Sequence, residues 1–129
     1  MTVGEIKDEV MFQTNNDIDD LEEYLPYLMD YINEGYDKLV YAWAKVHCED
    51  AGDEVEYPWM TEDTEEPNLP EWTHRALADY ATWLVYRNGN PQKQQRGLYF
   101  LRAFQEVLNR ILAMGGKNGT VKNFFNIPR

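Results

Sequence analysis

An apolar stripe at helical spacing runs through residues 18–46 and constrains the fold more than any other sequence feature. A repeat of three and four residues places its members on one face of an α-helix, whereas a strand would require alternation. The pattern predicts a long amphipathic helix that ends near Cys48. The stripe consists of Ile18, Leu21, Leu25, Leu28, Ile32, Tyr36, Leu39, Trp43 and Val46.

Two residues disturb this helix. Pro26 has no amide hydrogen and clashes with the carbonyl of Glu22, so we expect it to kink or restart the helix. Gly35 costs about 1 kcal/mol against alanine in a helix interior, and its small size permits close helix packing. The prediction is therefore one long helix, kinked or in two pieces.

A short helix precedes the long one. Thr2 and Glu5 have the spacing of a capping box, and Val3, Ile6 and Val10 follow at helical intervals, so we expect a helix that ends near Phe12. The polar run 13–16 breaks it, because short polar side chains compete for backbone hydrogen bonds. Asp17 or Asp19 then caps the long helix.

The second half of the chain predicts a helical hairpin. Leu69-Pro70-Glu71 begins an alanine-rich helix with the apolar face Trp72, Ala76, Tyr80 and Trp83 or Leu84. Asn88-Gly89-Asn90-Pro91 ends it, with Gly89 as a left-handed cap and Pro91 as the start of the next helix. The last helix carries Leu98, Leu101, Phe104 or Gln105, Leu108 and Ile111, and stops at Gly115-Gly116.

These elements together predict an all-α fold, a small bundle of about four helices. Residues 1–114 form a single helical domain, and residues 115–129 form a flexible C-terminal tail. The segment 49–68 interrupts the domain as a long solvated loop, because nine acidic residues without a basic one repel each other between 49 and 66. Its aromatic island 57–60 either docks on the body or forms a brief extended piece.

Composition excludes several classes of function. No apolar run approaches the ~20 residues of a membrane-spanning helix, and the N-terminus lacks the basic region and apolar core of a signal peptide. Cys48 is the only cysteine, so we expect a reducing compartment. The net charge of −11 argues against general nucleic-acid binding.

The charge is divided unequally between the two halves of the chain. Residues 1–71 carry a net charge of −18, and residues 72–129 carry +7. Opposite charges either pair inside one molecule or join copies head to tail, which closes a ring when the rotation permits.

Motifs of enzymatic chemistry are nearly absent, and we assign no catalytic, cofactor-binding or metal-binding residue. His47, Cys48 and His74 lack paired ligand spacing, and we interpret them as structural. The run 17–20 resembles the start of a calcium loop but lacks the glycine and glutamate that complete one, so we interpret it as a helix cap. Glu62 to Glu66 are interpreted as solvated surface.

The tail 115–129 is the one segment with candidate binding residues. It combines apolar and basic side chains without an amphipathic helix. Its aromatic residues either fold back on the body or insert into a partner with an acidic surface. The candidate partner-binding residues are Lys117, Lys122, Phe124, Phe125 and Arg129.

Two stretches of the sequence resemble the head–tail connector (adaptor) proteins of tailed bacteriophages. One is the short and long helix pair, TVGEIKDEVMFQTNND and LEEYLPYLMDYINEGYDKLVYAWA. The other is the hairpin LPEWTHRALADYATWLVYRNGNPQKQQRGLYFLRAFQEVLNRIL. They cover about three-quarters of the chain and contain no catalytic or ligand motif.

The resemblance implies a structural protein that forms a ring on the portal, extends the DNA channel and receives the tail or stopper protein. It implies that the tail 115–129 grips the portal, and that the protein is assembled in the bacterial cytoplasm into a virion. The alternative is a small acidic binding module, either a DNA mimic or an inhibitor that occupies a basic groove. The carboxylates are expected in a loop and on one helix rather than in two rigid rows, which weakens that alternative.

Overall fold

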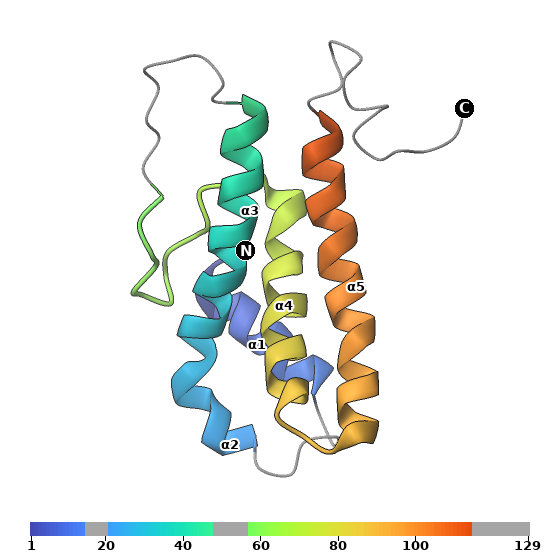
Figure 1. Cartoon of the computed structure of the whole chain (residues 1–129). Helices are drawn as coiled ribbons and strands as arrows, with labels where there is room; N and C mark the ends of the chain where they lie inside the picture. The colour runs from blue at the N-terminus through green and yellow to red at the C-terminus, as the bar shows by residue number, and fades with distance from the viewer. Residues whose placement is uncertain (15–20, 48–56, 115–129) are drawn as a thin grey trace, which may run out of the picture.

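The computed structural model describes residues 1–14, 21–47 and 57–114, and this part of the chain contains helices and no strand. The predicted all-α bundle of about four main helices is confirmed (Figure 1). The elements in chain order are α1 (Val3–Gln13), α2 (Leu21–Tyr24), the 3₁₀ turn η1 (Leu25–Tyr27), α3 (Leu28–His47), the 3₁₀ turn η2 (Glu71–Thr73), α4 (His74–Arg87) and α5 (Pro91–Ala113).

Helix α4 is the centre of the bundle and packs against α1, α3 and α5. Figure 1 shows α3, α4 and α5 side by side along the length of the molecule, with α1 lying across them. The chain turns back between α4 and α5, so these helices form the antiparallel hairpin that the short 88–91 connection predicted. Apolar side chains from all four long helices meet in one core.

Burial on α4 is broader than its predicted apolar face. Trp72 precedes the helix and is partly exposed, with the Arg110 guanidinium 4.5 Å from its ring centroid. The buried positions of α4 lie on almost all sides because three helices surround it, and small alanines let them approach closely. These buried residues are His74, Ala76, Leu77, Ala78, Ala81, Thr82, Leu84, Val85 and Tyr86.

The long predicted helix is divided at Pro26, as expected. The chain passes from α2 through η1, which contains Pro26, into α3. Leu25 is 40% exposed at this break, whereas Leu28, Ile32 and Leu39 on α3 are buried as the stripe predicted. The proposed caps Asp17 and Asp19 lie outside the described residues.

The helix ends show which local predictions hold. The Thr2–Glu5 capping box is present. Asn90, the residue before Pro91, caps α5, because its side chain accepts a hydrogen bond from the Lys93 amide at 2.9 Å. The expected left-handed cap at Gly89 is wrong, because its φ lies outside the positive range. The missing side chain of Gly89 instead leaves room for Lys93, because a Cβ at position 89 would lie only 2.9 Å from the Cβ of Lys93.

The described part of the acidic segment, residues 57–68, has no helix, and its aromatic island docks on the body, which is one of the two alternatives that the sequence left open. Met60 is only 3% exposed, and Leu69, just beyond the segment, is also buried. Asn33 on α3 holds Met60 through two hydrogen bonds of 2.9 Å, one to its carbonyl oxygen and one from its amide. The segment therefore lies along α3, with its aromatic island docked on the helix (Figure 1).

Candidate functional site

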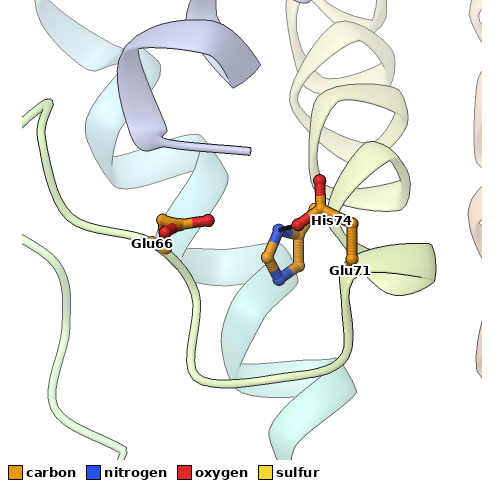
Figure 2. A group of neighbouring side chains, drawn as sticks. All are labelled: Glu66, Glu71 and His74. Carbon is orange, nitrogen blue, oxygen red and sulfur yellow. Dashed lines mark ion pairs between the residues drawn. The ribbon is translucent and has the colours of Figure 1, made fainter.

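A cluster of ionisable groups lies where α1 begins, and we call it the N-terminal cluster. It consists of the Met1 nitrogen, Glu66, Glu71 and His74. The Met1 nitrogen lies 2.8 Å from both carboxylate oxygens of Glu71, 2.9 Å from His74 Nδ1 and 3.4 Å from Glu66 Oε1. Figure 2 shows the three side chains converging, with Glu66 from the segment 57–68, Glu71 from η2 and His74 as the first residue of α4.

His74 is the fixed member of this cluster. Its side chain is 4% exposed, and its Nε2 lies 2.7 Å from the carbonyl oxygen of Leu69. A carbonyl oxygen only accepts hydrogen bonds, so Nε2 carries a proton and donates it. In the neutral imidazole, Nδ1 is then the acceptor, and its lone pair points into the cluster.

The charges of the cluster stabilise each other. Burial disfavours the charged form of the Met1 ammonium, but hydrogen bonds and attraction from Glu71 and Glu66 outweigh this effect and raise its pKa. The hydrogen bond from the same ammonium is the main cause that lowers the pKa of Glu71. Both carboxylates are well exposed, at 61% for Glu66 and 70% for Glu71, and can be reached from solvent.

The start of α1 is also tied to the acidic segment by its backbone. The amides of Val3 and Gly4 donate to the carbonyl oxygens of Glu65 and Asp63 at 2.8 and 2.9 Å. Lys7 adds an ion pair to Asp63 at 2.7 Å. These bonds satisfy backbone donors that the first turn of a helix leaves free, and they bring the N-terminus to the cluster.

The histidines singled out in the sequence have separate surroundings. His47, at the end of α3, stacks on Trp43 with a centroid distance of 3.9 Å, so it packs as a structural residue. His74 joins carboxylates, which the sequence interpretation missed. The signal was the spacing of three residues between Glu71 and His74, which places both on one side of a helical turn. Cys48 lies outside the described residues.

The predicted partner-binding residues all fall in 115–129, outside the described residues. The body nevertheless shows a groove near the helix end from which this tail continues. The groove has a volume of about 480 Å³ between α3 and α5, and its apolar lining includes Tyr41, Leu108 and Leu112. Lys38 and Lys45 also line it.

Basic residues outnumber acidic ones on α5. Helix α5 has four basic residues and one acidic residue, and Arg96, Tyr99 and Arg102 lie on its exposed side. Among the described residues, no carboxylate forms an ion pair with Arg102 or Arg110. We call the exposed side of α5 with Arg96, Arg102 and Arg110 the basic edge.

No helix within the described ranges has the length and apolar character needed to cross a membrane. No protein-family model, no curated protein and no solved structure matches this chain.

Proposed function

We propose that this protein is a structural head–tail connector of a phage or prophage particle, which assembles as a ring on the portal and extends the DNA channel toward the tail or stopper protein. The observation that carries the proposal is the separation of charge in the folded chain. Helix α5, which carries four basic residues, lies on the other side of α3 from the acidic segment 57–68, which contains four carboxylates and no basic residue (Figure 1).

The ion pairs of the described residues leave this separation in place. They join α1 to the acidic segment and to α4: Lys7 pairs with Asp63, and Glu9 pairs with Arg75 at 3.3 Å. No cation of α5 takes part in these ion pairs. A repeated subunit with one acidic and one basic side can place unlike charges together at every contact of a head-to-tail ring, which closes when the rotation permits.

The exposed aromatic side chains support an assembly role. Phe12, Tyr41 and Tyr99 are each at least 70% exposed. Aromatic residues are enriched where protein surfaces bind each other, because they bury a large area at a low cost in conformational entropy. In the proposed ring, Tyr99 lies between two arginines at the subunit contact, and the tail 115–129 holds the portal with Phe124 and Phe125.

The decisive experiment is capture by the portal protein that the connector proposal expects to be encoded beside this gene. We expect purified portal rings to retain the full chain in a ring of stoichiometric copies visible by electron microscopy. A chain that ends at Met114 should lose portal capture. The double variant Arg96→Glu/Arg102→Glu should bind portal without completing the ring.

The matched control is Lys45→Glu/Arg87→Glu. It changes the net charge by the same amount as Arg96→Glu/Arg102→Glu, but its substitutions are on α3 and α4 instead of α5. It should form rings like the unmodified chain. Failure of the full chain to bind portal would contradict the connector proposal, and displacement of labelled duplex DNA from a basic protein would instead support the acidic mimic. Full capture by the chain that ends at Met114 would remove the role of the tail.

A further inference from the structure

We propose that Glu66, Glu71 and His74 form a binding site for a divalent transition-metal ion of the zinc class. One imidazole nitrogen and two carboxylate oxygens offer ligand atoms that all lie within 4.8 Å of one another. Zinc binds such donors at about 2.0–2.2 Å, so the donors of a tetrahedral site lie roughly 3.3 Å apart. His74 Nδ1 and the Glu71 oxygen are 3.0 Å apart and already lie close to that spacing.

The position between the three acceptors already accommodates a cation. The Met1 ammonium occupies the position between the three acceptors, at 2.8–3.4 Å from each. A metal ion uses the same lone pairs at shorter distances and carries twice the charge. It therefore takes over this position, and the Met1 nitrogen moves aside.

The site combines a fixed ligand with two adjustable ones. His74 is buried, and the carbonyl oxygen of Leu69 holds its Nε2–H at 2.7 Å. Such an outer hydrogen bond orients a metal-bound histidine and fixes the nitrogen that faces the metal. Glu66 and Glu71 are exposed, so their side chains can close around the ion, and the ion can enter from solvent.

The donor set indicates the class of metal. Calcium and magnesium prefer shells made only of oxygen, whereas an imidazole together with carboxylates suits zinc and neighbouring first-row ions. The ion would tie the segment around Glu66 to the start of α4, two parts of the chain that the fold already brings together. Because the unfolded chain does not hold these ligands together, binding should raise thermal stability.

The test is a calorimetric titration of the metal-free full chain with ZnCl₂ at pH 7 in a non-chelating buffer. We expect one zinc ion per chain. The variant Glu66→Gln/Glu71→Gln should bind at least tenfold more weakly. The matched control Glu62→Gln/Glu106→Gln removes two exposed charges outside the cluster and should bind like the unmodified chain.

A second measurement follows His74 directly and does not depend on a variant that folds. Zinc should shift the Nδ1 resonance of His74 in ¹⁵N NMR spectra and raise the melting temperature, whereas 1 mM MgCl₂ should do neither. Unchanged zinc affinity in Glu66→Gln/Glu71→Gln would overturn the site, as would an unshifted Nδ1 resonance at saturating zinc. Equal effects of magnesium would overturn the assigned class of metal.

Discussion

Gly97 shows how a single missing side chain sets the distance between two helices. A Cβ at this position of α5 would lie 2.7 Å from the Cβ of Tyr86 and 2.9 Å from the Trp83 ring, both on α4. Gly97→Ala should therefore lower the free energy of unfolding by about 1–3 kcal/mol through overpacking. Urea denaturation measures this loss.

The matched control is Gly4→Ala in α1. Its Cβ would make ordinary contacts of 3.4 Å or more, so the better helix propensity of alanine should leave stability unchanged or raise it by up to about 1 kcal/mol. Equal effects of the two substitutions would show that helix propensity, not the close approach of α5 to α4, decides the outcome at Gly97.

Asp79 carries a charge that folding disfavours. Burial raises the pKa of its carboxyl group, while the hydrogen bond from Gln13 Nε2 at 2.9 Å partly opposes the shift. A raised pKa means that the contribution of Asp79 to stability is fully present below the unfolded pKa near 3.8 and is lost as the pH rises through the folded pKa.

Asp79→Asn should consequently be more stable than the unmodified chain at pH 7, because the amide still accepts the bond from Gln13 without a buried charge. The advantage should disappear as the pH falls below about 4. Thermal melts between pH 3 and 7 test this, with Glu106→Gln as an exposed control. A variant less stable at pH 7 would contradict the explanation.

At the scale of elements, Asn33 is the residue that fastens an irregular segment to a helix. Its side chain is buried on α3 and pairs with both backbone polar groups of Met60. Asn33→Ala leaves two buried backbone groups without partners and should cost about 2–4 kcal/mol. The Met60 amide should also lose its protection in hydrogen exchange, while amides in α5 keep theirs.

Asp37 provides the comparison on the same helix. Its carboxylate accepts a hydrogen bond from Trp59 Nε1 at 2.8 Å, but this contact is exposed. Asp37→Ala should cost no more than about 1 kcal/mol, because water replaces the lost partner. If both substitutions cost the same, the buried pairing is not what holds the segment on α3.

The contrast between elements explains what the sequence could predict. Periodicity, the Thr2–Glu5 box and Pro26 are local signals, so the helices and the break in the long helix were predictable. The docking of Met60 depends on one asparagine 27 residues earlier in the chain, and the N-terminal cluster joins Met1 to Glu71 over 70 residues. A local sequence pattern cannot predict contacts between residues so far apart in the sequence. In the cluster, only the spacing of Glu71 and His74 was open to sequence reasoning.

At the scale of the whole molecule, two electrostatic effects oppose each other. The net charge of −11 makes copies repel at long range, whereas in the proposed ring the acidic segment of one copy would attract α5 of the next at short range. The two effects can be distinguished by varying the salt concentration, because the Debye length falls from about 30 Å at 0.01 M to about 8 Å at 0.15 M and about 3 Å at 1 M. Repulsion between copies dominates at 0.01 M salt, and both the repulsion and the attraction are screened at 1 M salt.

Attraction between copies should therefore be strongest near 0.1–0.2 M salt, where the second virial coefficient from static light scattering should pass through a minimum. Arg96→Glu/Arg102→Glu should abolish that minimum. Lys45→Glu/Arg87→Glu lowers the net charge by the same amount and should retain it, because α5 is intact. A coefficient that falls steadily with salt in the unmodified chain would mean that net charge alone governs its self-interaction, and the separation of charge would then have no role in assembly.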